Sequence, residues 1–258
     1  MGDTPHTGFG IKESDACKGF AVLLLLWHHL FLRRPEYGPV AQMLAGLAMW
    51  RELGDPSSIA LGLNYVSQTA IYLGRPEEAH AYLQESLSLL TPVGERWGMG
   101  TAYRLLGLTA LAQDHIDDAM SYIRKSLDLI AGIITGWDVA CSLIYLGEAT
   151  AVAGDLAEAR RLFRDGLRVA METQSTPLVL DALAGLASLH FRAGEAAIAW
   201  ELCAVVTDHP AVVFATKQRA CLVRAKAECM LTAEQTRAAW ERAASQTLPE
   251  LVDRMLAG

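Results

Sequence analysis

Hydrophobic residues recur every three or four positions through most of the chain, and the whole pattern repeats after forty residues. The stretch "PEEAHAYLQESLSLL" begins at Pro76, and "IDDAMSYIRKSLDLI" begins at Ile116 in the same register. Positions i, i+4, i+8 and i+11 lie on one face of a helix, so each stretch predicts an amphipathic helix. We expect one small residue of each stretch to lie where two helices cross, because a larger side chain would hold them apart. That residue is an alanine at five positions forty apart: Ala79, Ala119, Ala159, Ala199 and Ala239.

A second helix is predicted upstream of each of these. It is marked by a large apolar residue, a Leu or Val three positions later and then a small residue, as in segments 103–107 and 143–147. Short turns join the two helices. Gly74, Gly154 and Gly194 fall just beyond the first helix, where a left-handed residue commonly ends a helix. The pattern therefore predicts five or six antiparallel helical pairs and no strand.

These spacings resemble those of a tetratricopeptide (TPR) array, whose units follow the pattern W-x₂-L-G-x₂-Y…A-x₃-F…P. The segment from Leu143 to Phe163 fits best, with Leu-x₂-Leu-Gly followed by Ala-x₃-Phe. The sequence departs from the motif in its longer period, in the missing leading Trp and in a closing Pro that is out of register. HEAT repeats, with a period near 40 residues, are the structural alternative. The resemblance implies an all-α fold, a right-handed α-solenoid of TPR-like helix–turn–helix pairs with a period of about 40 residues.

The segment from Met49 to Leu90 is also similar to the longer-period TPR arrays of bacterial STAND-class ATPase regulators, and so is the short helical ending after Met230. The resemblance extends from about Pro35 to Gly258. It implies the C-terminal sensor region of a signal-transducing transcriptional regulator. The chain contains neither a G-x₄-G-K-[ST] phosphate-binding loop nor a helix-turn-helix with a basic recognition helix, so we expect the sensor alone. The alternative is a free-standing TPR adaptor that scaffolds protein partners. The two differ in whether the native reading frame continues upstream of Met1 into an NTPase module.

Three regions are expected along the chain. Residues 1–15 are polar and contain glycine, which favours a flexible N-terminal tail. Residues 16–218 are assigned to the TPR-like repeats, whose first pair, about 16–53, is degenerate. A first repeat that departs from the pattern is typical of a cap or of a unit cut from a longer array. Residues 219–258 are assigned to C-terminal capping helices.

Composition narrows the classes of function. Of the 258 residues 52% are hydrophobic and 20% charged, which is typical of a globular chain, and the net charge is −7. An acidic chain without a Lys/Arg run is a poor candidate for binding nucleic acid. The cysteine count is odd, 5, and no C-x-x-C pair occurs, which indicates reduced thiols in a cytoplasmic protein. The longest apolar run, Phe20 to Trp27, is far short of the roughly 20 residues that span a bilayer, so we expect no membrane segment.

No residue pattern indicates catalysis or a cofactor. Adjacent His28 and His29 point to different sides of a helix, and His190 is expected to be a hydrogen-bonded core histidine. The acidic pairs at 77–78 and 117–118 suit the beginning of a helix better than acid–base chemistry. We therefore expect a protein that is not an enzyme, with no catalytic residue, no metal and no cofactor.

The remaining candidate site is the concave surface of the solenoid, which the first helix of each pair lines. A mixture of amides, charges and aromatic rings there suits a protein, an extended peptide or a small polar ligand; the alternative is a merely solvated face. We expect Arg104 to anchor the ligand, because its guanidinium is a planar fork of donors suited to carboxylate or phosphate. The predicted ligand-binding residues are Asn64, Gln68, Tyr72, Thr101, Arg104, Leu108, Ile144, Tyr145, Glu148, Asp181, Ser188 and Arg192.

Overall fold

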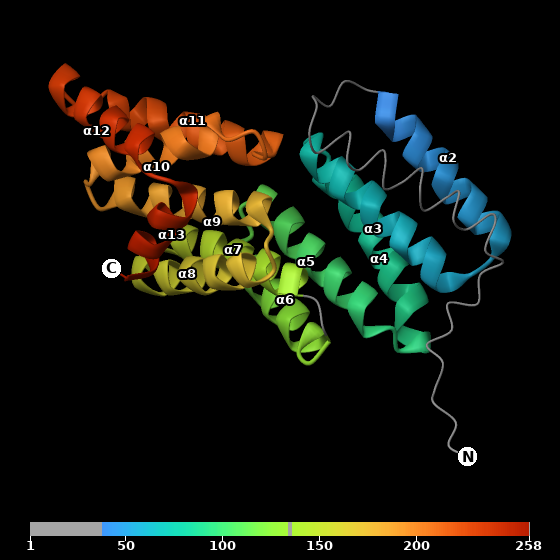
Figure 1. Ribbon diagram of the computed structural model, residues 1–258. Helices are drawn as coiled ribbons and strands as arrows, with labels where there is room; N and C mark the ends of the chain where they lie inside the picture. Colours follow the sequence, from blue (N-terminus) through green and yellow to red (C-terminus); the bar gives the residue numbers. More distant parts are fainter. Residues whose placement is uncertain (1–37, 134–135, 258) are drawn as a thin grey trace, which may run out of the picture.

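The computed structural model describes residues 38–133 and 136–257, and these residues form helices and no strand (Figure 1). The expectations for the N-terminal tail, the beginning of the first pair, the apolar run and the His28–His29 pair lie outside the described residues. The first helices of the repeating pairs are α3 (Pro56–Tyr72), α5 (Arg96–Ala112), α7 (Gly136–Ala153) and α9 (Thr176–Arg192). The second helices are α2 (Gly38–Leu53), α4 (Pro76–Val93), α6 (Ile116–Ile130), α8 (Leu156–Glu172) and α10 (Ala196–Asp208). The last three helices are α11 (Phe214–Glu228), α12 (Ala233–Ser245) and α13 (Leu248–Ala257).

Local signals place the helix boundaries forty residues apart. Helices α3, α5, α7 and α9 begin at Pro56 and then at each fortieth residue, and α4, α6, α8 and α10 do the same from Pro76. The turn inside each pair contains one residue in the left-handed region, with φ of +69° at Gly74, +98° at Gly154 and +81° at Gly194. In the pair α5–α6 Asp114 takes this place with φ of +59°, a conformation that Asp tolerates better than most residues.

The alanines lie at helix crossings, as their spacing predicted. All five, from Ala79 to Ala239, are fully buried. The partner helix adds a glycine or another small residue at several crossings. A Cβ atom on Gly107 would meet the Ile123 side chain, and one on Gly147 would meet the Phe163 ring. Small residues thus let the backbones of paired helices approach, while Phe163 and similar side chains fill the space beside them.

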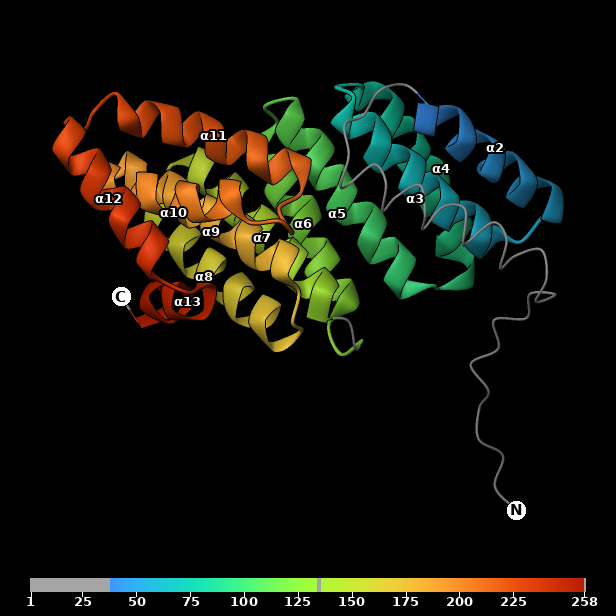
Figure 2. The ribbon, with the colours of Figure 1, turned by 45° about the horizontal axis from the view of Figure 1, so that its top comes forward.

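Adjacent first helices also contact one another. α3 packs on α5, α5 on α7, α7 on α9 and α9 on α11, whereas the second helices α4, α6 and α8 do not pack side by side. The array therefore curves with the first helices inside, and their exposed faces form the concave surface (Figures 1 and 2).

The C-terminal helices do not continue the antiparallel pairing of the repeats. α9 packs along α10, but α11 and α12 diverge from a shared turn and do not pack along their lengths (Figure 2). Instead α12 packs on α10, and α13 packs on α8. The buried carboxylate of Glu201 on α10 holds this end together, because it accepts hydrogen bonds from Arg242 at 2.9 Å and from Arg254. The expected boundary at residue 219 lies within α11.

Candidate functional site

The larger of two cavities on the concave surface, here called the inner cavity, has a volume of about 290 Å³. All four regular first helices contribute to it, and the beginning of α11 closes one side. Its lining residues are Gln68, Ile71, Tyr72, Leu108, Trp137, Cys141, Tyr145, Glu148, Pro177, Leu178, Asp181, Val213, Ala215, Thr216 and Arg219. Most of these are apolar or aromatic, and the charged groups are Glu148, Asp181 and Arg219.

These three charged residues form one ion-pair cluster. Arg219 of α11 pairs with Glu148 of α7 and with Asp181 of α9. Thr216 Oγ1 donates a second hydrogen bond to Asp181 Oδ1, at 2.6 Å. Burial raises the pKa of Asp181 to about 6, although the hydrogen bond from Thr216 acts in the opposite direction. The cluster joins two successive helical pairs to α11 across the cavity.

The remaining polar groups of the inner cavity are neutral. Cys141 is almost wholly buried, and burial raises the pKa of its thiol to about 12. Burial also raises the pKa of the Tyr145 hydroxyl well above its ordinary value. Because the thiolate is the nucleophilic form of cysteine, Cys141 is poorly suited to covalent chemistry.

The second cavity, here called the Arg104 cavity, adjoins the first and has a volume of about 230 Å³. Gln68 and Trp137 line both cavities. Its lining residues are Leu61, Asn64, Tyr65, Gln68, Trp97, Thr101, Arg104, Leu105, Trp137 and Asp138. The two cavities therefore form one continuous strip along the concave surface, from α3 to α11.

Arg104 is held by an ion pair with a carboxylate of the next helical pair. Its Nη2 atom lies 3.1 Å from Oδ1 of Asp138, and the other carboxylate oxygen accepts a hydrogen bond from Trp97 Nε1 at 2.8 Å. The guanidinium also lies over the Trp137 ring, 5.2 Å from its centroid. Arg104 is only 3% exposed. Its charge is thus neutralised inside the protein, although its Nε atom and Thr101 Oγ1 are buried without a hydrogen-bond partner among the described residues.

Asn64 has a structural partner as well. Its side-chain Nδ2 donates to the carbonyl of Gly98 at 3.2 Å, and its Oδ1 accepts from Ser86 at 2.9 Å. These bonds join α3 to α4 and α5. Both polar atoms of the Asn64 amide therefore already have partners within the array.

The structure brings together nine of the twelve predicted residues, and these line one or both cavities: Asn64, Gln68, Tyr72, Thr101, Arg104, Leu108, Tyr145, Glu148 and Asp181. Three others line neither cavity. Ile144 is fully buried in the core, where Gly166 of α8 leaves room for its side chain, so its expected place on the concave surface is corrected. Arg192 is exposed at the end of α9 and donates to the carbonyl of Ala151, and Ser188 is half-buried beside neither cavity.

Sequence analysis missed the residues that complete the two cavities. Trp97 and Trp137 stand forty residues apart at the beginning of their helices, which is a repeat signal that could have been followed. Asp138 then comes directly after the second tryptophan. No comparable signal marks Thr216 and Arg219, which belong to a helix that begins outside the forty-residue step.

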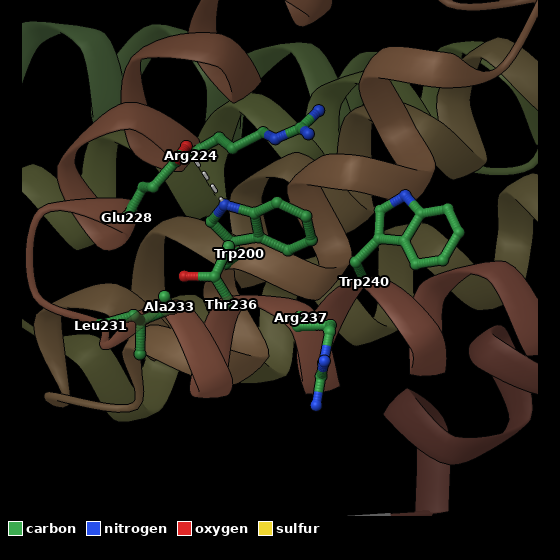
Figure 3. Close-up of a pocket in the computed structure, with 8 residues that line it drawn as sticks. All are labelled: Trp200, Arg224, Glu228, Leu231, Ala233, Thr236, Arg237 and Trp240. Carbon is green, nitrogen blue, oxygen red and sulfur yellow. Dashed lines mark hydrogen bonds between the residues drawn. The ribbon is translucent and has the colours of Figure 1, made fainter.

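A third cavity, here called the terminal cavity, lies where α11 and α12 diverge (Figure 3). The buried ring of Trp200 lies under the guanidinium of Arg224, 4.5 Å from ring centroid to Cζ, and its Nε1 donates to Glu228 at 3.4 Å. Trp240 is 56% exposed at the same cavity, and Arg237 points away from Trp200 (Figure 3). The cavity is an open depression, and none of the predicted ligand-binding residues lines it.

Neither a membrane-spanning helix nor a metal-binding cluster occurs among the described residues. In residues 38–133 and 136–257 no helix combines the length and the hydropathy required to cross a bilayer. Within the same ranges, no three His, Cys, Asp or Glu side chains are grouped as a metal would need. His190 forms a pair with Glu195, as expected for a core histidine.

Comparison with known proteins identifies the architecture. No protein-family model matches the chain, and no curated protein matches it. Among solved structures, a STAND protein with a tetratricopeptide repeat sensor from Pyrococcus horikoshii superposes with a TM-score of 0.65 at 13% identity, over 95% of this chain and 38% of that one. BtubC (BKLC) from P. vanneervenii superposes with a TM-score of 0.58 at 10% identity, over 95% of this chain and 92% of that one.

These similarities show the fold. The chain is an all-α solenoid of the TPR type, as its repeat spacings predicted. It spans 38% of the length of the STAND protein, so the activity of that whole protein is not carried over with the fold. Stacked helical repeats of this kind create an extended concave surface.

Proposed function

We propose that the chain is a non-catalytic interaction and sensor module that binds a ligand along the inner and Arg104 cavities. In this proposal it is the sensing part of a bacterial, cytoplasmic, signal-transducing transcriptional regulator, and it does not bind nucleic acid itself. The observation that carries the proposal is the inner cavity, to which four successive helical pairs and α11 all contribute. A ligand that fills this cavity touches one helix of each of these four pairs and α11.

The polar groups of the strip support a ligand-binding role. Arg104 and Thr101 line the Arg104 cavity, and Arg104 Nε and Thr101 Oγ1 are buried without a partner among the described residues. Buried polar atoms are nearly always hydrogen-bonded, so an unpaired donor beside a cavity is suited to a ligand acceptor. The apolar walls of the inner cavity supply the contact area that small-molecule and peptide sites require.

A sensor role is favoured by the way the ion pairs connect elements. Arg219 links α11 to α7 and α9, so any ligand that rearranges this cluster changes how α11 is attached. A ligand can shift a conformational equilibrium only through different contacts in the two states, and the cluster provides such contacts.

The alternative is a free-standing adaptor that scaffolds protein partners. It is favoured by the superposition with BtubC, because this chain covers 92% of BtubC and an array of this length can therefore make up nearly a whole protein. The two proposals differ in the genomic reading frame. An NTPase module encoded upstream of Met1 in the same frame supports the sensor, and a separate start with no such module supports the adaptor.

The binding site can be tested by blocking the inner cavity. A thermal-shift screen with peptide and small-molecule libraries should yield ligands for the native chain, and Ala215→Trp should abolish their binding because an indole at this half-buried position fills the cavity. Ala157→Trp, on the exposed beginning of α8, is the matched control. Ligands that bind Ala215→Trp and the native chain equally well would show that the site lies elsewhere.

A further inference from the structure

Carboxylates outnumber cations along the two cavities of the concave surface. Asp138, Glu148 and Asp181 line them, against the guanidinium groups of Arg104 and Arg219. Since Arg104 is paired with Asp138, the other two carboxylates share Arg219 alone. A carboxylate in a poorly solvated cavity is costly without a full counter-charge. The inner cavity therefore lacks one positive charge.

The walls around these two carboxylates suit a cation that carries an apolar body. Tyr72, Trp137 and Tyr145 line the same cavity, and aromatic rings attract ammonium and guanidinium groups. The chain already uses this combination once, because the Arg104 guanidinium lies both over the Trp137 ring and against Asp138. A volume of about 290 Å³ equals roughly ten water molecules, which limits the ligand to a small group or one side chain.

We propose that the inner cavity binds an organic monocation, an ammonium or guanidinium group on an apolar body, between Glu148 and Asp181 and beside Arg219. The inference rests on the proposed function, because it names the ligand class of the same groove. A cation there brings three positive charges against three negative ones along the strip. An anion would raise the imbalance to four against two.

Arg219 is the internal competitor of this ligand. Its side chain is 39% exposed, whereas that of Asp181 is 9% exposed, so the guanidinium can move toward solvent while the carboxylate stays in the cavity. Removal of the guanidinium leaves two carboxylates with no cation. Arg219→Gln should therefore bind the monocation more tightly than the native chain does, although it loses both ion pairs of Arg219.

The test uses three probes that share a phenyl ring and differ in charge: 2-phenylethylammonium, neutral 2-phenylethanol and phenylacetate. Binding to the full chain is measured by titration calorimetry at pH 7.5. We expect binding of the cation alone, weakened about tenfold to hundredfold in Asp181→Asn and in Glu148→Gln, as for loss of a charge-assisted hydrogen bond. Asp165→Asn on α8 and Arg224→Gln on α11 are matched controls that lie outside the inner cavity and should leave the affinity unchanged.

A second arm separates the two sources of such a cation. The peptide acetyl-Ala-Arg-Ala-amide is compared with its citrulline analogue, which has the same shape and no charge. Tighter binding of the arginine peptide than of 2-phenylethylammonium identifies a partner protein's side chain as the ligand, and the reverse order identifies a small molecule.

Two results would overturn the proposal. One is binding of the neutral or anionic probe at least as tight as that of the cation, and the other is absence of cation binding. Far-UV spectra and melting temperatures establish whether each variant folds. If Asp181→Asn does not fold, the affinity of Glu148→Gln for the cation tests the proposal. If 2-phenylethylammonium does not bind while Ala215→Trp still abolishes binding of the screened ligands, only the proposed ligand class is wrong. If Ala215→Trp has no effect either, the proposed function fails as well.

Discussion

Arg104 of α5 and Asp138 of α7 form a buried ion pair that joins two successive helical pairs. Their side chains are 4% and 7% exposed, and 3.1 Å separates Nη2 from Oδ1. The pair lies at the floor of the Arg104 cavity, where Trp97 also donates to the carboxylate. Arg104 is therefore part of what holds the array together, in addition to being a lining residue of the proposed site.

Arg104→Ala should destabilise the protein strongly. Removal of one partner leaves Asp138 buried without a counter-charge, which typically costs about 3–5 kcal/mol. Urea unfolding followed by circular dichroism measures the change. The matched control is Arg51→Ala, which breaks an exposed ion pair with Glu85 and should cost under about 1 kcal/mol. Equal costs for the two variants would contradict the structural role of Arg104.

The sequence predicted the parts of this fold that depend on local spacing. A helix, its crossing alanine and the left-handed residue of its turn all lie within about forty residues, so the repeat defines them. It could not define which charges meet between pairs. Arg104 was expected to face a ligand, and the carboxylate that neutralises it lies in the first turn of the first helix of the next pair. Arg219 was assigned to the C-terminal capping helices, and the structure places it at the inner cavity, in a helix that begins outside the forty-residue step.

The crossing alanines should not tolerate larger side chains. Ala119 and Ala159 are fully buried, so Ala119→Leu and Ala159→Leu should each cost about 1–3 kcal/mol by overpacking. Ala112 is exposed at the end of α5, and Ala112→Leu should change the free energy of unfolding by less than about 0.5 kcal/mol. Denaturant titration of the three variants measures the difference. A cost at Ala112 that equals the cost at the crossings would mean that the crossing positions are misplaced.

Gly185 should be required by the Phe163 ring that packs against it. A Cβ atom at residue 185 would meet three ring atoms, and a rigid aromatic side chain cannot bend away. Gly185→Ala should cost about 1–3 kcal/mol. The second change Phe163→Leu removes the ring, so the double variant should be more stable than the sum of the two single costs predicts. Strictly additive costs in thermal or urea unfolding would show that the two residues do not interact.

Asp181 should make the stability of the protein depend on pH in a defined direction. Burial raises the pKa of its carboxyl from 3.8 to about 6 in the folded chain. The native state therefore binds more protons than the unfolded state between these values, and the free energy of unfolding falls as pH rises from about 4 through 6. The groups that face this carboxyl are Thr216 and Arg219 on α11, Glu148, Tyr145 and Cys141 on α7, and Tyr72 on α3.

Asp181→Asn isolates that contribution. The difference in unfolding free energy between the native chain and the variant should shrink or reverse as pH rises from about 4 to 7, because only the native chain must ionise residue 181. Urea unfolding at several pH values measures it. A difference that stays constant over this interval would show that the Asp181 carboxyl keeps its ordinary pKa.

The chain should neither bind duplex DNA nor hydrolyse ATP. Its net charge of −7 opposes binding to phosphates, and its sequence has no phosphate-binding loop. Fluorescence anisotropy with a labelled duplex should show no binding even at a low salt concentration of about 50 mM, where electrostatic attraction is strongest. ATPase activity that copurifies with the chain through successive columns, or salt-sensitive DNA binding, would contradict this expectation.

The ion pairs of the inner face also set the mechanics of the array. In a solenoid most contacts join neighbouring units, and its curvature follows from the small rotation between one unit and the next. Ion pairs that join first helices on the concave side oppose straightening of the array. The Arg104–Asp138 pair and the Arg219 cluster both span that side, and they tie α5 to α7 and α7 and α9 to α11. These ion pairs therefore contribute to the curvature of the array, and we expect the loss of one of them to change the distance between the two ends of the molecule.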